Sequence, residues 1–169
     1  MRETIVDRAY AKTLLPPRKE DGHKGDFGKL LVLGGSVGYT GAPYLAASAA
    51  VHSGCGLVYL GVPESIWAVE AQKCVSAMPF PLPETDGRLC LAALDKMQDK
   101  LKGCDVLALG PGLGRGKETE QLVHALLWQV KEPLVLDADG LNALQAVSYT
   151  HLRAHENEAD LVCRLLLEK

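Results

Sequence analysis

Residues 29–50 read KLLVLGGSVGYTGAPYLAASAA, and this stretch indicates the fold most directly. The continuous apolar run 30–33 is typical of a strand buried on both faces of a parallel sheet. Glycines follow at positions 34, 35, 38 and 41, and an alanine-rich helical segment comes next. The stretch therefore predicts a strand, a glycine loop and a helix whose free N–H groups point toward the loop. A polar or anionic ligand would fit there, and a tight structural turn is the alternative.

The composition is that of one globular domain. The chain has 169 residues, 47% of them hydrophobic, which is too short for two ordinary domains. A net charge of −3 with scattered basic residues argues against nucleic-acid partners. Because no apolar run resembles a signal peptide or a membrane span, we expect a cytoplasmic protein without membrane partners. The five cysteines lack C-x-x-C spacing, so we expect neither disulfides nor a metal site.

The rest of the chain alternates apolar runs with helical periodicity. Besides 29–33, strands are expected at 56–61, 75–79, 106–109 and 133–137. Helices are expected at 7–14, 41–53, 64–72, 92–102 and 118–131. This alternation predicts an α/β fold in which helices cover a parallel sheet.

Three of the expected strands end in loops rich in glycine or acidic residues. These loops are GGSVGYTGA at 34–42, GPGLGRG at 110–116 and DADGLNAL at 137–144. Because ligands of open α/β sheets bind outside the carboxyl ends of the strands, we expect the three loops to converge on one site. His23 and Lys24, just before the first strand, are either further cations for an anionic ligand or part of an exposed loop.

Individual residues in the second and third loops have two interpretations each. Backbone N–H groups and Arg115 of the second loop suit a phosphate, but a rigid connection with a solvated arginine is the alternative. In the third loop, Asp139 either binds ligand or caps the next helix. Asp137 and Asp139 would point to the same side of a continued strand, so one would bind ligand while the other holds the loop. The spacing does not separate these roles.

The segments 23–63, 108–116 and 133–144, in this order and at these separations, resemble the ADP- or ATP-dependent NAD(P)H-hydrate dehydratases. The resemblance covers residues 20–146 and implies a three-layer α/β/α ribokinase-like fold. It also implies repair of hydrated NADH or NADPH: ADP or ATP, with Mg²⁺, phosphorylates the hydrate, and elimination of phosphate restores the nicotinamide ring. A cytoplasmic homo-oligomer is expected for the full-length enzyme.

The same resemblance implies the substrate-binding residues. In the family, the alanine after the first glycine loop and a glycine of the GPGLG turn contact the hydrated dinucleotide, and these match Ala42 and Gly112. Asp139 and Asn142 lie in the matching third loop and are carried over as substrate-binding residues.

The resemblance stops at the C-terminal side. The family pattern continues through a T-P-H-P-G-E segment, a lysine-bearing nucleotide loop and a G-x-G-D motif whose aspartate acts near the transferred phosphate, and none of these occurs here. We therefore interpret residues 1–147 as the N-terminal part of a dehydratase domain that lacks the catalytic aspartate. Residues 148–169 are interpreted as a non-native, adapter-derived tail, with a divergent amphipathic helical end as the alternative.

This interpretation has consequences for activity and stability. Without the phosphate-handling residues, the 169-residue chain should show little or no turnover. Its sheet should end in an unpaired strand near 133–137, which would favour aggregation. The competing functions are a ribokinase-like kinase of a vitamin-precursor alcohol and a module that binds a dinucleotide without chemistry.

Overall fold

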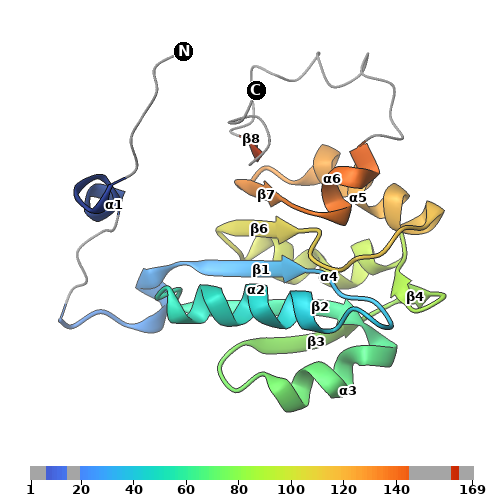
Figure 1. Ribbon diagram of the computed structural model, residues 1–169, viewed down its shortest axis with the longest axis horizontal. Helices are drawn as coiled ribbons and strands as arrows, with labels where there is room; N and C mark the ends of the chain where they lie inside the picture. Colours follow the sequence, from blue (N-terminus) through green and yellow to red (C-terminus); the bar gives the residue numbers. More distant parts are fainter. Residues whose placement is uncertain (1–6, 15–19, 145–160, 164–169) are drawn as a thin grey trace.

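A computed structural model of the chain describes residues 7–14 and 20–144 and the backbone of residues 161–163. Its main sheet has six strands in the order β3-β2-β1-β6-β7-β8, and every neighbouring pair is parallel (Figure 1). The strands are β1 (Lys29–Leu33), β2 (Leu57–Pro63), β3 (Met78–Leu82), β6 (Val106–Leu109), β7 (Leu134–Leu136) and β8 (Leu161–Cys163). The predicted α/β fold with a parallel sheet is confirmed.

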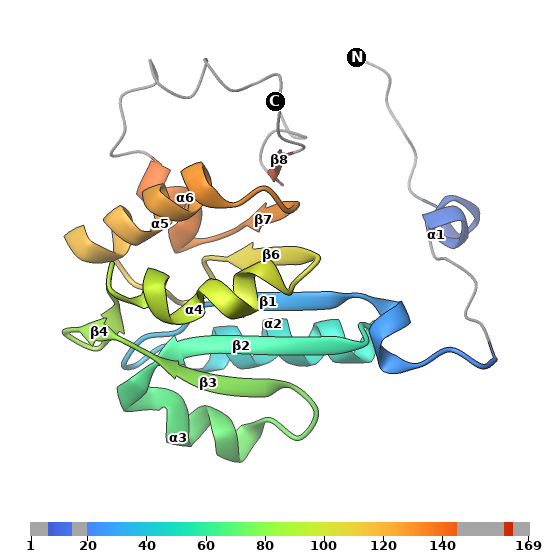
Figure 2. The same cartoon turned by 180° about the vertical axis from the view of Figure 1, so that it is seen from behind.

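Helices cover both faces of the sheet, which gives three layers. On one face lie α2 (Gly41–His52), in front of the sheet in Figure 1, and α3 (Glu64–Lys73). On the other face lie α4 (Ala93–Lys102), α5 (Lys117–Gln129) and the short α6 (Asp139–Leu144), as the view from behind shows (Figure 2). Within the described part of the chain, every helix is too short or too polar to cross a membrane.

The two faces explain why the run at 30–33 is apolar without alternation. Val32 is fully buried with Ala47 of α2 and Ile66 of α3. Its neighbours Leu31 and Leu33 are fully buried in a second cluster, which the residues of α4 and α5 share. Because successive side chains of a strand point to opposite faces, a strand covered on both sides needs apolar residues at every position.

Strand β3 lies three residues further along the chain than predicted. Val75, where the predicted strand began, is 97% exposed, and β3 instead spans Met78–Leu82. It carries Pro79 and Pro81, which a strand tolerates at a sheet edge because alternate residues present their backbone groups to the same, unpaired side. The side chain of Trp67 on α3 donates its Nε1–H to the carbonyl oxygen of Pro79 over 3.2 Å.

A small hairpin was missed by the sequence analysis. β4 (Glu84–Thr85) and β5 (Arg88–Leu89) pair antiparallel around Asp86 and Gly87. Both turn residues have positive φ, 50° and 72°, as a two-residue type I′ hairpin requires. Two further elements precede the sheet: α1 (Arg8–Leu14), close to the predicted helix, and the 3₁₀ helix η1 (Lys24–Phe27).

The expectation of an unpaired strand near 133–137 is wrong. β7 pairs with β6 on one side and with β8 on the other, in the register Leu134↔Leu161. β8 comes from the C-terminal stretch, so residues 161–163 form an edge strand and not the helix considered as an alternative for them. The remainder of 148–169 lies outside the described residues.

Candidate functional site

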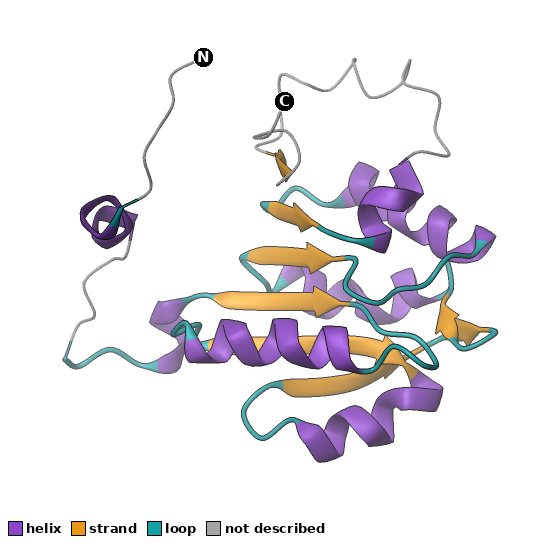
Figure 3. Cartoon of the chain, viewed as in Figure 1, coloured by secondary structure: helices purple, strands orange, loops and turns teal. Residues whose placement is uncertain are grey.

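The three predicted loops meet at one end of the sheet. They follow β1, β6 and β7, which are neighbours in the sheet and point the same way, so their carboxyl ends lie on the same side (Figure 3). We call them the first loop (34–40), the second loop (110–116) and the third loop (137–142, including the first residues of α6). The predicted convergence is confirmed by the hydrogen bonds between the loops.

Backbone and side-chain groups join the first loop to the second. The Gly35 N–H donates to the carbonyl oxygen of Pro111 over 2.9 Å. The Ser36 hydroxyl, which is buried, donates to the carbonyl oxygen of Gly112 over 2.8 Å. These bonds hold the two glycine loops side by side.

Gly112 and Ala42, both predicted as substrate-binding residues, lie close to each other across this junction. Gly112 has a φ of +69°, and a Cβ atom added to it would lie 3.3 Å from the Cβ of Ala42 and 2.9 Å from the carbonyl oxygen of Tyr39. Ala42 is exposed in the first turn of α2. Small residues at both positions therefore allow the two loops to approach and leave open surface beside them.

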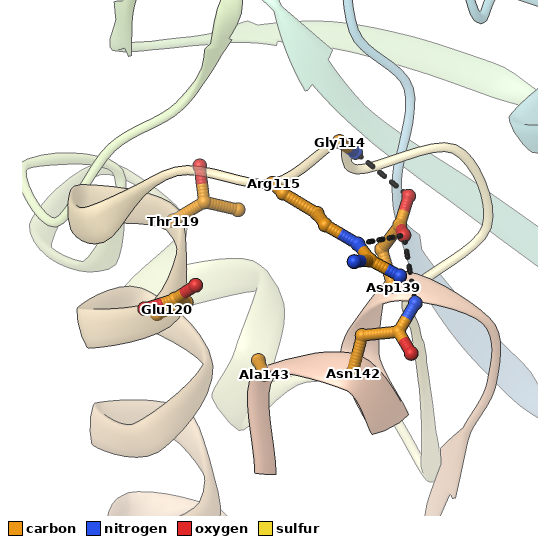
Figure 4. Close-up of a pocket in the computed structure, with 7 residues that line it drawn as sticks. All are labelled: Gly114, Arg115, Thr119, Glu120, Asp139, Asn142 and Ala143. Atoms are coloured by element: carbon orange, nitrogen blue, oxygen red, sulfur yellow. Dashed lines mark hydrogen bonds and ion pairs between the residues drawn. The ribbon is translucent and has the colours of Figure 1, made fainter. Parts of the chain in front are cut away.

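Asp139 joins the second loop to the third (Figure 4). Its Oδ2 accepts a hydrogen bond from the Gly114 N–H over 3.0 Å, and its Oδ1 accepts one from Nδ2 of Asn142 over 3.1 Å. The Arg115 Nε lies 4.0 Å from the same Oδ1. Asp139 is the first residue of α6, and its carboxylate bonds to the second loop and to Asn142 rather than to the backbone of the helix.

The structure separates the roles of Asp137 and Asp139, which the spacing left open. Asp139 holds the loops together, whereas the side chain of Asp137 is exposed and has no hydrogen-bonding or ionic partner among the described residues. The Asp137 backbone closes the turn: its N–H donates to Leu109 and its carbonyl oxygen accepts from Gly140. Asp137 is thus the carboxylate that remains available to a ligand.

A pocket of about 270 Å³ opens beside these residues (Figure 4). It lies between the second loop, α5 and α6, and its lining is mostly polar. The lining residues are Gly114, Arg115, Thr119, Glu120, Asp139, Asn142 and Ala143. Asp139 and Asn142 thus line a pocket, whereas Ala42 and Gly112 belong to the adjoining junction with the first loop.

The hairpin contributes residues to the site that the sequence analysis missed. Arg88 forms a β-bridge with Ser36 of the first loop. A Cβ atom on Gly114 would lie 3.1 Å from the Arg88 Nε, so the arginine covers the second loop. The buried Thr119 hydroxyl fixes the end of the hairpin by donating to the Leu89 carbonyl oxygen over 2.9 Å. The Asp-Gly pair at 86–87 is the signal that would have located this hairpin.

His23 and Lys24 are not part of the site. They lie at the start of η1, just before the amino end of β1, whereas the three loops follow the carboxyl ends of their strands. The His23 Nδ1 accepts a hydrogen bond from the Gly25 N–H, and it lies 3.4 Å from the Oδ2 of Asp26. The structure therefore favours the exposed-loop interpretation of these two residues.

Comparisons with known proteins identify the family to which this sequence is similar. A sequence model of the NAD(P)H-hydrate dehydratase family matches residues 30–161. The bifunctional NAD(P)H-hydrate repair enzyme Nnr of Moorella thermoacetica is 46% identical over 141 residues, which cover 83% of this chain and 27% of that enzyme. The chain therefore spans about a quarter of the length of such a relative.

Solved structures share the fold. A hypothetical protein from Streptococcus mutans superposes with a TM-score of 0.71 at 28% identity, over 86% of this chain and 50% of that protein. The ADP/ATP-dependent NAD(P)H-hydrate dehydratase of Bacillus subtilis, co-crystallised with ATP/Mg²⁺, gives a TM-score of 0.60 at 27% identity, over 79% of this chain and 45% of that enzyme. The ribokinase-like fold is confirmed, and the chain belongs to the NAD(P)H-hydrate dehydratase family.

Proposed function

We propose that this chain forms the substrate-side part of an enzyme that dehydrates hydrated NADH or NADPH with ADP or ATP. One observation carries the proposal: three loops of a dehydratase-family chain are bonded together at the carboxyl ends of β1, β6 and β7. That is where open α/β sheets bind their ligands. The family match supports the identity of the ligand.

We assign a separate role in ligand binding to each group of residues in the site. Ala42 and Gly112 offer small, closely packed surface on which part of the dinucleotide rests. Asp139 and Asn142 hold the third loop and line the pocket beside it. Asp137 offers a carboxylate to a hydroxyl or amide group of the ligand. Arg88 and Arg115 add positive charge near the second loop, which suits the phosphates of a dinucleotide.

The proposed reaction has two steps. A ring hydroxyl of the hydrate attacks the terminal phosphorus of ATP or ADP, losing its proton, and ADP or AMP leaves. Phosphate and a proton from the adjoining ring carbon are then eliminated, which restores the double bond of the nicotinamide ring. Most of the barrier to phosphoryl transfer is lowered by positioning and charge stabilisation, and the chain supplies positioning of the dinucleotide.

We attribute handling of the nucleotide and of Mg²⁺ to the G-x-G-D motif and nucleotide loop of the family, not to the described residues. Mg²⁺ in such sites is bound by one or two carboxylates together with substrate phosphates. Both oxygens of Asp139 already accept hydrogen bonds, so this carboxylate is engaged in holding the loops. The G-x-G-D motif is missing from the sequence. The B. subtilis relative co-crystallised with ATP/Mg²⁺ supports the use of both by the complete enzyme.

Binding and turnover by the 169-residue chain test the proposal separately. Equilibrium dialysis should show that the chain retains hydrated NADPH, and nicotinamide absorbance should not recover when ADP or ATP is added. Ala42→Trp should abolish retention, whereas Ala49→Trp, at an exposed position about two turns further along α2, should not. Absence of binding would refute the substrate assignment, and measurable turnover would refute the assignment of catalysis to the G-x-G-D motif that this sequence lacks.

We also propose that the full-length protein is a cytoplasmic homo-oligomer. Large exposed apolar side chains such as Leu45 and Trp128 support the homo-oligomer, and light scattering on the full-length protein tests it. Resequencing the gene past the codon for Ala146 tests whether residues 148–169 are native. Retention of a vitamin-precursor alcohol in place of the hydrate would favour the kinase alternative.

A further inference from the structure

A fully buried carboxylate lies on α3, away from the residues assigned to the site. The Glu70 side chain has no exposed surface, and its Oε2 has no hydrogen-bond partner among the described residues. Its Oε1 accepts from the Nζ of Lys73, one turn along the helix, over 3.1 Å. Burial of a carboxylate is unfavourable, and buried ion pairs contribute little net stability. Fold stability is therefore a weak explanation for this pair.

Lys73 also connects its ion pair with Glu70 to the first loop. Its Nζ donates to the carbonyl oxygen of Thr40 over 3.1 Å and to the Thr40 hydroxyl oxygen over 2.7 Å. With the bond to Glu70, all three N–H groups of the ammonium are engaged. Thr40 immediately precedes Gly41 and Ala42, so α3 is tied to the segment that the proposed substrate contacts.

Thr40 does not make the hydrogen bond that is usual for a threonine at a helix N-cap. Thr40 is the N-cap of α2, where a threonine hydroxyl ordinarily accepts a hydrogen bond from the helix backbone, yet it makes no such bond here. Its hydroxyl oxygen is occupied by Lys73 instead. The first N–H groups of α2 are therefore left without a side-chain cap, and they include the N–H of Ala42.

We propose that Lys73 and Glu70 are positioning residues for the substrate loop. Lys73 holds the carbonyl and hydroxyl groups of Thr40 away from α2, so that the N–H groups at the start of that helix face the dinucleotide. Glu70 keeps the ammonium in place, because the Lys73 side chain is 32% exposed and water competes for it. Neither residue touches the substrate. The identity of the ligand rests on the proposed function, whereas the anchoring of the loop does not.

Hydrogen exchange of the 169-residue chain tests the anchoring without a ligand. Lys73→Met removes the donors and Thr40→Val removes the acceptor hydroxyl, and each should speed amide exchange in a peptide covering residues 34–45 about ten-fold, as expected for loss of hydrogen bonds to a charged group. Thr40→Ser restores the hydroxyl and should exchange like the wild type. Lys96→Met, at an exposed lysine on α4, is the matched control. Thr40→Val leaves the Glu70–Lys73 pair in place, so it should change exchange in the loop alone. Lys73→Met also leaves the buried Glu70 carboxylate without its cation and should therefore raise exchange throughout the chain as well. Exchange raised throughout the chain by Thr40→Val would count against a role confined to the loop.

Binding of NADPH, the product of the proposed repair, gives the second measurement. Lys73→Met and Thr40→Val should each weaken binding about ten-fold. The double variant should be no weaker than Lys73→Met alone, because the bond that Thr40→Val removes is one of those that Lys73→Met already removes. Glu70→Gln should speed loop exchange, because an amide oxygen holds the Lys73 ammonium less strongly than a carboxylate does.

The outcomes separate the two proposals. If the wild type does not bind NADPH or its hydrate but Lys73→Met and Thr40→Val speed loop exchange, the proposed function fails and the positioning role stands. If the wild type binds NADPH and these variants alter neither affinity nor loop exchange, the positioning role is overturned. Additive losses of affinity in the double variant would likewise overturn it.

Discussion

Replacement of Gly112 by alanine tests how closely the first and second loops must approach. The left-handed backbone conformation of Gly112, with a φ of +69°, is unfavourable for a non-glycine residue by about 1–2 kcal/mol. The new methyl group would also lie 2.9 Å from the carbonyl oxygen of Tyr39, so the backbone of the first loop must move. Overpacking of this kind lowers the free energy of unfolding by about a further 1–3 kcal/mol.

Gly38 provides the matched control. It also has a left-handed conformation, with a φ of +88°, but a Cβ atom added to it would meet nothing within 4 Å. Gly38→Ala therefore carries the backbone strain alone, about 1–2 kcal/mol. The difference between the two variants measures the contact between the loops.

Urea unfolding at 25 °C and NADPH affinity are the two assays. Gly112→Ala should lower the free energy of unfolding by more than Gly38→Ala does, by about 1–3 kcal/mol. It should also weaken NADPH binding at least about ten-fold, which corresponds to 1.4 kcal/mol, and by more than Gly38→Ala does. Equal losses of stability in the two variants, or wild-type affinity in Gly112→Ala, would refute the argument that this junction shapes the site.

Three further variants probe the link between loops, the buried thiol and the core. Asp139→Ala should lower the free energy of unfolding by about 1.5–3 kcal/mol, and Asp139→Asn by less, because one amide oxygen can accept one of the two hydrogen bonds; identical losses would contradict this. Burial raises the pKa of the Cys104 thiol, so its contribution to stability is present below the ordinary pKa of 9.0 and is lost as the pH rises through the folded-state pKa. Cys104→Ala should therefore flatten the alkaline decline measured by urea unfolding, and an unchanged slope would count against it. Leu122→Ala, at a fully buried position of α5, should destabilise by about 2–5 kcal/mol, whereas Leu45→Ala, at an exposed one, should change stability by less than about 0.5 kcal/mol.

The parts of the fold that could be predicted are those where local pattern and burial coincide. β1 and β6 have the predicted bounds, because a strand covered on both faces is apolar at every position and ends where its loop begins. β3 could not be located as well, since its prolines resemble those of a loop and only its place at the edge of the sheet permits them. The strands of the hairpin are two residues long and carry no periodicity at all.

Some features of the candidate site could likewise be predicted from the sequence, and others could not. The convergence of the three loops follows from the alternation of strands and helices, which is visible in the sequence. The bond from Asp139 to Gly114 joins residues in different loops, and its formation depends on loop conformations that no local pattern specifies. Glu70 illustrates a further limit: it follows Ile66 by four residues on the buried side of α3, where helical spacing predicts an apolar residue.

The prolines of β3 also determine at which edge of the sheet a further strand can pair. Neither proline has an N–H group to offer to a further strand, and Trp67 already occupies the carbonyl oxygen of Pro79. This edge is closed to strand addition, from the same chain or from another molecule. An additional strand can join only at the opposite end, past β7, where the three residues of β8 now lie. Completion of the sheet in a longer chain would therefore take place beside the third loop, and the short β8 occupies the position for which the next strand would compete.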